Sequence, residues 1–177
     1  MIVVTGGAGF IGSNLINYLI DKKGCKVASI DWHNKENELY FLSKNFEKVN
    51  PKDLEDFLER NLKEISIIVH LGAITSTTEI NLNLIIKNNI DLSLKLWEWC
   101  AKNKKRFIYA SSAATYGNGE NGFDDSSDDK NLSNLIPLNL YGWSKHLIDK
   151  FIWNHQKTLL KQCVGLKFFN VYGPNEF

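Results

Sequence analysis

A glycine-rich segment near the N-terminus constrains the fold of this chain more than any other feature. It reads Thr5-Gly6-Gly7-Ala8-Gly9-Phe10-Ile11-Gly12 and lies between an apolar run of strand length and a run of helix length. In that context we expect Gly7 to permit a tight turn, Gly9 to let a pyrophosphate approach the backbone, and Gly12 to let the helix pack close to the sheet. The helix N-terminus adds free N–H groups and a partial positive charge. The segment predicts a phosphate-binding turn, with a glycine-rich turn that holds no ligand as the alternative.

Asp31 helps to separate these two interpretations. It ends the second apolar run of strand length, 19 residues after Gly12. An acidic side chain about 20 residues after such a turn is the usual partner of the adenosine ribose in a dinucleotide. The turn and Asp31 together predict a dinucleotide site.

The rest of the chain alternates short apolar runs with longer amphipathic ones. Near-continuously apolar strands that alternate with helices are typical of a parallel sheet covered by helices on both faces. The predicted fold class is therefore α/β, a Rossmann-type doubly wound parallel sheet, and residues 1–177 fit one domain. Gly117–Asn134 is predicted to be a surface loop, and Asn50-Pro51 to cap a helix. Strands are predicted at Ile2–Thr5, Lys26–Ile30, Phe46–Val49, Ile65–His70, Arg106–Ala110 and Val164–Phe169, and helices at Phe10–Asp21, Lys52–Leu62, Asn81–Lys102 and Leu140–Leu160.

Tyr141 and Lys145 form a candidate catalytic pair. They stand four residues apart in Tyr141-Gly142-Trp143-Ser144-Lys145, so on a helix they share one face. A lysine ammonium close to a tyrosine phenol favours the phenolate, which can exchange a proton with a sugar hydroxyl while a nicotinamide takes the carbinol hydride. Tyrosine and lysine are common on helices, so a surface pair without a role is the alternative. The preceding order of strand, glycine-rich turn and βα units favours the catalytic interpretation.

Two further segments follow predicted strands and are expected at the carboxyl edge of the sheet, where open α/β folds bind ligands. Ser111 and Ser112 follow Arg106–Ala110 and can hydrogen-bond a substrate hydroxyl and the tyrosine oxygen. Capping of the strand end is their alternative role. Leu71-Gly72-Ala73 follows Ile65–His70, and its glycine lets a cofactor pass close to the backbone, with an ordinary loop as the alternative.

Composition and charge argue against other functional classes. The formal net charge of +1 gives no electrostatic case for nucleic acid or an anionic membrane surface. Cys25, Cys100 and Cys163 are odd in number and form no CxxC pair, which suits the reducing cytoplasm. The first residues carry neither a basic region nor a long apolar run, so we expect no signal peptide and no membrane span.

The sequence predicts no metal site. The histidines have no metal-ligand spacing with cysteines or carboxylates, and the acidic residues between 124 and 129 lack the calcium-loop pattern. His70 ends an apolar strand and is interpreted as a packed residue rather than a functional one. The histidines are His33, His70, His146 and His155, and the acidic residues are Asp124, Asp125, Asp128 and Asp129.

Taken together, the motifs resemble those of the extended short-chain dehydrogenase/reductases that act on nucleotide sugars. TGGAGFIG, LGA, SSAATYG, YGWSK and FNVYGP occur in that family's order and span the chain. Within the family the chain is most similar to the ADP-L-glycero-D-manno-heptose 6-epimerases, through Ser76-Thr77-Thr78-Glu79, Asn88-Asn89 and the segments 110–117 and 169–174. Nucleotide-sugar 4,6-dehydratases usually carry Asp-Glu where this chain has Ala113-Ala114, which argues against dehydration.

The resemblance implies a role for each matched position. Tyr141 is implied as an acid/base residue, Lys145 holds the nicotinamide ribose, Ser112 assists at the substrate hydroxyl, and Asn170 touches the substrate. The implied cofactor-binding residues are Gly6, Gly9, Phe10, Ile11, Gly12, Asp31, Trp32, Leu71, Gly72, Ala73, Ile74, Thr75, Asn88, Lys145 and Val171.

The reaction, cofactor and partners also follow from the resemblance. Tightly held NADP removes hydride from C6 of an ADP-linked heptose and returns it to the other face of the transient aldehyde. The family points to NADP, with Lys35 and Lys52 as candidates for its extra phosphate, whereas Asp31 alone suggests NAD. Trp32 stands where the heptose epimerases usually have asparagine. A homo-oligomer is expected for the full-length protein, through the helix at Asn81–Lys102 or the helix from Leu140.

Members of the family are longer than this sequence. They continue after FNVYGP into a substrate-binding domain, and the heptose epimerases carry a second acid/base lysine shortly after that point. Residues 1–177 therefore correspond to the cofactor-binding part. Three functions stay open: an ADP-heptose 6-epimerase, another nucleotide-sugar epimerase such as a UDP-hexose 4-epimerase, and a dinucleotide-binding module without catalysis, since a site that is not closed from water is a poor catalyst.

Overall fold

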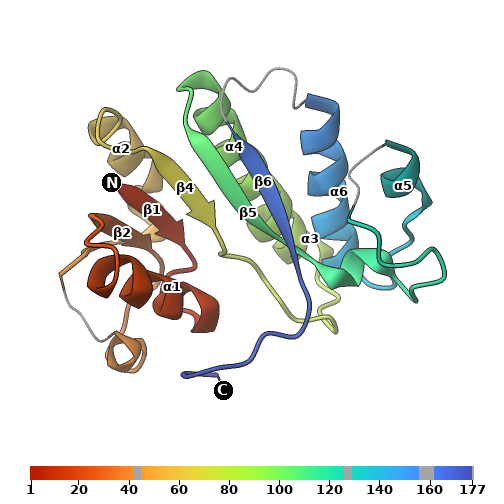
Figure 1. Ribbon diagram of the computed structural model, residues 1–177, viewed down its shortest axis with the longest axis horizontal. Helices are drawn as coiled ribbons and strands as arrows, with labels where there is room; N and C mark the ends of the chain where they lie inside the picture. Colours follow the sequence, from red (N-terminus) through yellow and green to blue (C-terminus); the bar gives the residue numbers. More distant parts are fainter. Residues whose placement is uncertain (42–44, 126–128, 156–161, 177) are drawn as a thin grey trace.

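A six-stranded parallel sheet organises the fold. The structure, a computed structural model, describes residues 1–41, 45–125, 129–155 and 162–176. The strands lie in the order β3-β2-β1-β4-β5-β6 (Figure 1), which confirms the predicted α/β class and the Rossmann-type sheet. The strands are β1 (Ile2–Thr5), β2 (Val27–Ile30), β3 (Glu47–Val49), β4 (Ile67–His70), β5 (Arg106–Ser112) and β6 (Cys163–Phe168).

Helices cover the sheet on both faces, because successive residues of each strand point into two different cores. On β1, Val4 packs in one core with Ile16 of the first helix, whereas Val3 belongs to a second core with Phe57 and Leu96. The sheet is therefore doubly wound. The helices are α1 (Phe10–Asp21), α2 (Leu54–Arg60), α3 (Leu82–Ile85), α4 (Leu92–Lys102), α5 (Asp129–Asn134) and α6 (Leu140–His155).

The strand order reverses at β1, which has β2 on one side and β4 on the other. Thr5 is in register with Ile30 of β2 and with His70 of β4, so these three strands end at the same level. In open α/β sheets a ligand crevice forms outside the carboxyl ends of the strands at such a reversal. The fold therefore places a crevice directly beyond Thr5.

The predicted helix at Asn81–Lys102 is interrupted by a π-helical segment at Ile86–Asp91, between α3 and α4. Regular helical spacing of apolar residues gives no sign of this interruption. The π-helical segment contains Asn89, which is fully buried. Such segments occur frequently at functional sites.

The predicted loop at Gly117–Asn134 is wrong at its end, where α5 forms. Leu132 is buried with Leu135 in a small core against Tyr116, and Trp153 packs on the same core. Because polar residues surround these two leucines in the sequence, the composition of the segment suggests a loop. Burial of the leucines nevertheless stabilises a short helix. A 3-10 turn at Ala113–Tyr116, which the sequence did not predict, precedes this segment.

Other boundaries differ from the predictions by one or two residues, apart from two helices. The predicted helix at Lys52–Leu62 is a 3-10 turn followed by α2, and the Asn50 side chain accepts from Lys52 N, which confirms the predicted cap. Residues 156–160 of the predicted helix Leu140–Leu160 lie outside the described residues. The strand β5 runs two residues further than predicted, to Ser112, and so brings this serine to the sheet edge.

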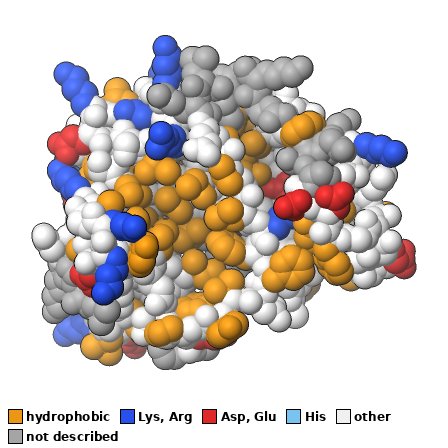
Figure 2. All heavy atoms as spheres, in the orientation of Figure 1, with side chains coloured by type: hydrophobic (Ala, Val, Ile, Leu, Met, Phe, Trp, Pro, Cys, Tyr) orange, Lys and Arg blue, Asp and Glu red, His pale blue; other side chains and the backbone are white. Residues whose placement is uncertain are grey.

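One face of the sheet is only partly covered. Helix α1 packs over β1 and β2 (Figure 1), and hydrophobic side chains gather beside it in the middle of the face shown in Figure 2. Leu166 of β6 is 40% exposed. In the described part of the chain, none of the helices has the length and apolar character needed to cross a membrane.

Candidate functional site

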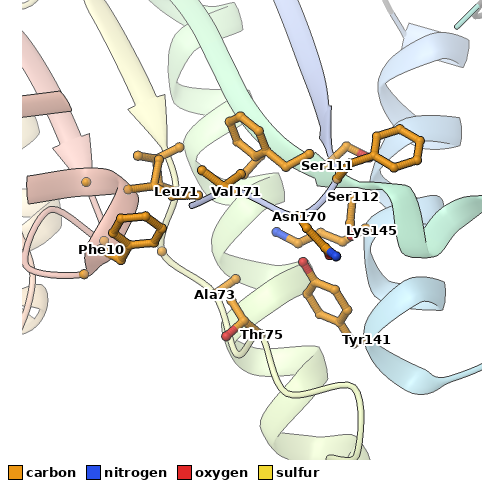
Figure 3. A pocket seen from close by; sticks show the side chains of 18 of the residues that line it. Phe10, Leu71, Ala73, Thr75, Ser111, Ser112, Tyr141, Lys145, Asn170 and Val171 are labelled. Atoms are coloured by element: carbon orange, nitrogen blue, oxygen red, sulfur yellow. The ribbon is translucent and has the colours of Figure 1, made fainter. Parts of the chain in front are cut away.

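A cavity of about 730 Å³ lies at the carboxyl ends of the strands, where the strand order reverses (Figure 3). The glycine-rich turn, the loop after β4, the end of β5, helix α6 and the segment after β6 all contribute to its wall. The structure thus brings together most of the residues that the sequence predicted for the site. Those residues are Gly6, Gly9, Phe10, Ile11, Gly12, Asp31, Leu71, Gly72, Ala73, Thr75, Ser112, Tyr141, Lys145, Asn170 and Val171.

The glycine-rich turn forms one wall, and three of its glycines serve the fold. Gly6 has a φ of +69°, and a Cβ there would meet the backbone of Gly72. A Cβ on Gly12 would collide with the carbonyl oxygen of Gly6. Gly7 was expected to permit the tight turn, but the left-handed residue is Gly6, and Gly7 instead packs closely against Ser29.

Gly9 is different, because the protein leaves room for a side chain there. The nearest atom to an added Cβ is the Gly6 oxygen at 3.5 Å, which is an ordinary contact. Gly9 precedes α1 and lines the cavity, so its open side faces the space next to the helix N-terminus. This space suits a phosphate group, which needs close access to the backbone and gains from the helix dipole.

The carboxylate of Asp31 is held beside this turn. Its Oδ2 accepts from Ala8 N at 2.9 Å and its Oδ1 accepts from Trp32 N at 2.7 Å. Each carboxylate oxygen keeps acceptor capacity for a further donor such as a ribose hydroxyl. Trp32 was predicted to contact the cofactor, but it does not line the cavity and is 57% exposed, with Lys52 Nζ 5.9 Å from its ring centroid.

Asn89 holds the loop after β4, a role that the sequence did not predict, whereas the residue predicted to contact the cofactor is its neighbour Asn88. Asn89 Oδ1 accepts from Ile74 N at 2.8 Å, and its Nδ2 donates to Ile74 O at 2.9 Å. Ile74, which was predicted to contact the cofactor, does not line the cavity, whereas the adjacent Thr75 does. The Asn88 amide donates to Leu84 O within its own helix, and Asn88 does not line the cavity. The sequence shows two adjacent asparagines, and only the π-helical segment determines which one points inward.

Tyr141 and Lys145 point into the cavity from α6, with Asn170 close by (Figure 3). Lys145 Nζ lies 5.9 Å from the ring centroid of Tyr141. The lysine is only 4% exposed, and burial lowers its pKa to about 8, although the nearby Asp149 carboxylate acts in the opposite direction. A buried ammonium that faces a cavity is stabilised when polar ligand groups, such as ribose hydroxyls, bind there.

Ser112 and Ser111 at the end of β5 have separate roles. The Ser112 oxygen accepts from Ala114 N at 3.1 Å, which leaves its hydroxyl proton available on the cavity side. Ser111 also lines the cavity, but its hydroxyl donates to Asp149 Oδ2 at 2.7 Å. Strand-end capping and a cavity position therefore coexist at Ser112.

Asp149 is a supporting residue that the sequence reasoning missed. It is buried, and besides Ser111 it accepts from Tyr109 at 2.9 Å and from Lys167 at 2.6 Å. These contacts hold α6, which carries Tyr141 and Lys145, against β5 and β6. Its position four residues after Lys145 on the same helix face is the sequence signal that could have found it. Further lining residues that were not predicted are Ala110, Phe168, Phe169, Tyr172 and Glu176.

No group of three or more histidine, cysteine, aspartate or glutamate side chains within the described ranges is arranged to hold a metal ion. Asp128, one of the acidic residues considered in the sequence, lies outside those ranges.

Gly9 and Gly12 give a matched pair of substitutions. Gly9→Ala is expected to leave the free energy of unfolding nearly unchanged and to abolish dinucleotide binding, because the added methyl group enters only the phosphate space. Gly12→Ala is expected to destabilise the fold by about 1–3 kcal/mol, because its methyl group meets backbone atoms. Urea denaturation and a dinucleotide titration measure the two effects. Full-strength binding by Gly9→Ala would contradict this assignment of the turn.

Lys145→Met is expected to stabilise the ligand-free chain at pH 7 by about 1–3 kcal/mol, while it weakens dinucleotide binding. The folded-state pKa of Lys145 is about 8, below its ordinary value of 10.5. Between these values the unfolded state binds more protons, so the unfolding free energy of the unmodified chain rises with pH and the advantage of the variant shrinks. Denaturation at pH 7 and pH 10 tests this, with the exposed Lys102→Met as the control. A variant that is less stable than the unmodified chain at pH 7 would oppose the prediction.

Two known proteins with similar sequences share one name, ADP-L-glycero-D-manno-heptose-6-epimerase. An ADP-L-glycero-D-manno-heptose-6-epimerase of Fusobacterium nucleatum is 40% identical over the whole of this chain, which covers 54% of that protein. One of Nitratidesulfovibrio vulgaris is 38% identical over the whole chain and is covered to 55%. The chain therefore spans about half the length of the curated relatives it matches.

Solved structures show the same fold. The UDP-N-acetylglucosamine 4-epimerase of Methanobrevibacter ruminantium superposes with a TM-score of 0.83 and 32% identity, covering 99% of this chain and 56% of that one. The ADP-L-glycero-D-manno-heptose-6-epimerase of Helicobacter pylori gives a TM-score of 0.75 and 33% identity, with 98% and 56% covered. Residues 2–177 match the family described as the NAD dependent epimerase/dehydratase family. The chain, with its reversed strand order, its glycine-rich turn and its Tyr141–Lys145 pair, belongs to that NAD-dependent epimerase/dehydratase family.

Proposed function

We propose that this chain is the cofactor-binding part of a nucleotide-sugar epimerase that inverts C6 of an ADP-linked glyceromanno-heptose. The observation that carries the proposal is that Tyr141 and Lys145 face the same cavity that the Gly9 turn opens for a diphosphate. The heptose substrate is supported by the two relatives at 40% and 38% identity, whose names specify it. Those relatives are about twice as long, and we propose that recognition of the sugar also needs the part that this chain does not span.

The cavity fits a nicotinamide dinucleotide. Gly9 leaves space for phosphates, Asp31 keeps acceptor capacity for the adenosine ribose, and Lys145 presents a buried ammonium for the nicotinamide ribose. When bound, this cofactor supplies the acceptor and the donor of the hydride. The remaining chemistry belongs to residues of this chain.

Tyr141 is proposed to move the proton. Its phenolate takes the hydroxyl proton of the sugar when the C6 carbinol is oxidised, and its phenol returns a proton to the oxygen when the carbonyl is reduced on the opposite face. Lys145 stabilises the phenolate through its charge. The Ser112 hydroxyl donates to the sugar oxygen and orients it, and Asn170 contacts the substrate from the segment after β6.

A UDP-sugar 4-epimerase is the second candidate. The observation in its favour is the TM-score of 0.83 to a UDP-N-acetylglucosamine 4-epimerase. A dinucleotide-binding module without catalysis is the third, because the chain spans about half the length of its relatives. We further propose a reducing, cytoplasmic setting for the three free cysteines, and a homo-oligomer that buries the exposed side chains of Trp143 and Leu147 on α6.

The finer proposal for the cofactor is NADP, with NAD as the alternative. Lys52 places a cation over Trp32, next to the ribose-binding Asp31, where it can meet a 2′-phosphate. Asp31 favours NAD, because its carboxylate accepts from a 2′-hydroxyl and repels a phosphate.

Lys52→Ala is expected to weaken NADP binding about fivefold and to leave NAD binding unchanged, since an exposed ion pair contributes about 1 kcal/mol. Calorimetric titration with each dinucleotide measures this, and Lys102→Ala, at an exposed lysine that does not line the cavity, is the matched control. Tighter binding of NAD than of NADP by the unmodified chain would remove the NADP proposal.

The activity itself is tested by incubating the full-length protein with ADP-D-glycero-D-manno-heptose and dinucleotide, and following the configuration at C6 by NMR. Tyr141→Phe is expected to keep the dinucleotide affinity within about twofold and to lower turnover by at least about a hundredfold, because it removes only the proton carrier. Inversion at C4 of a UDP-hexose instead of C6 of the heptose would support the second candidate. Dinucleotide binding without turnover of either sugar would support the third.

A further inference from the structure

His70 ends β4 directly behind the cavity, and both of its ring nitrogens are hydrogen-bonded. The residue is 2% exposed, with Nδ1 2.7 Å from Thr5 Oγ1 and Nε2 2.9 Å from Ser93 Oγ. Its ring also stacks near Phe107, with 6.2 Å between centroids. The sequence interpretation of His70 as a packed residue is therefore incomplete. It is packed, and it also joins the end of β1 to helix α4.

The neighbouring hydroxyl groups determine where the proton of the imidazole lies. Ser93 Oγ donates to Asn89 O at 2.5 Å, so its single proton is committed and it accepts from His70. Nε2 therefore carries the proton, and Nδ1 accepts from the Thr5 hydroxyl. The Thr5 oxygen in turn accepts from Gly72 N at 3.3 Å. Burial, with a smaller contribution from the Lys145 charge, lowers the pKa of His70 to about 3, which keeps the imidazole neutral.

The chain of hydrogen bonds continues to the catalytic helix. The backbone carbonyl of Asn89 accepts the hydrogen bond from Ser93. The side chain of Asn89 is hydrogen-bonded to both the backbone N–H and the backbone carbonyl of Ile74. Asn89 Nδ2 also donates to Ser144 Oγ at 3.0 Å, and Ser144 donates to the carbonyl oxygen of Tyr141 at 2.7 Å. The loop after β4 is thus tied at Gly72 and at Ile74, and through Asn89 to α6.

Gly72 needs such a tie because it has no side chain to hold it. Its backbone lies against the glycine-rich turn, where a Cβ on Gly6 would meet the nitrogen and Cα of Gly72. A shift of Gly72 would therefore move into the turn or widen the cavity between Gly6 and the loop. His70 itself does not line the cavity, so any influence on a ligand passes through these hydrogen bonds.

We propose that His70 is a positioning residue for dinucleotide binding, in which a neutral imidazole protonated at Nε2 fixes Gly72, through Thr5, relative to Asn89. This inference rests on the proposed function, because it takes the cavity as a dinucleotide site. His70 would then influence the affinity for the dinucleotide although it does not line the cavity. The tautomer is part of the proposal, since in the opposite tautomer Nε2 would face the Ser93 oxygen with no proton between them, because Ser93 donates to Asn89 O.

Thr5→Val and Ser93→Ala break the relay on either side of His70 with little change in side-chain size. Each is expected to raise the dissociation constant for NAD and for NADP about three- to tenfold, as one lost buried hydrogen bond predicts. The double variant is expected to show less than the product of the two effects, because either change already interrupts the same relay. Phe57→Leu, at a buried position of α2 that does not line the cavity, is the control. It is expected to lower the melting temperature while the dissociation constant stays within about twofold.

Nitrogen NMR of the histidine rings provides a second measurement, the tautomer of His70, which does not depend on the overall stability of the fold. The expected signature for His70 is a neutral ring with a slowly exchanging proton on Nε2 and an unprotonated Nδ1. A proton on Nδ1, or dissociation constants that follow the melting temperature equally in the relay and control variants, would overturn the proposal. Failure of the unmodified chain to bind either dinucleotide would instead refute the proposed function, whereas binding that Thr5→Val and Ser93→Ala leave unchanged would refute only the role of His70.

Discussion

The close approach of two main-chain segments, the turn after β1 and the loop after β4, is the constraint on which the site depends. Because β1 and β4 are neighbours in register, Thr5 and His70 end at the same level, and the glycines Gly6 and Gly72 that follow them lie against each other. Gly6 takes a left-handed conformation against Gly72, which only a glycine accommodates there. The contact sets the floor of the cavity, and the turn then opens at Gly9.

The sheet topology explains why Tyr141 and Lys145 face the same space. Strands β2 and β3 follow one another on one side of β1, and strands β4, β5 and β6 follow one another on its other side. Helix α6 returns from β5 and presents Tyr141 and Lys145 to the strand ends. The order of motifs along the sequence predicted this arrangement, because a parallel sheet brings all carboxyl ends to one edge. Asp31 was predicted by the same reasoning, and the structure places it on the cavity wall.

The sequence could not predict features that depend on which way a side chain points. Asn88 and Asn89 are chemically identical, and the π-helical segment alone turns Asn89 inward. The short helix α5 arises from burial of Leu132 in a segment whose composition resembles a loop. His70 looks like a core residue in an apolar strand, and its hydrogen-bond partners come from β1 and α4, far away in sequence. In each case the deciding interaction is tertiary, and local propensity contains no trace of it.

The buried polar groups divide into two classes, and the division indicates where the site needs rigidity and where it needs a ligand. His70, Asn89 and Asp149 have partners within the chain, so they hold the loop, the strand ends and α6 in place before any ligand arrives. Lys145 is as deeply buried, yet its charge faces the cavity and burial lowers its pKa. A chain that keeps such an ammonium gives up stability in its ligand-free state, and a ligand that satisfies the charge regains that free energy as affinity.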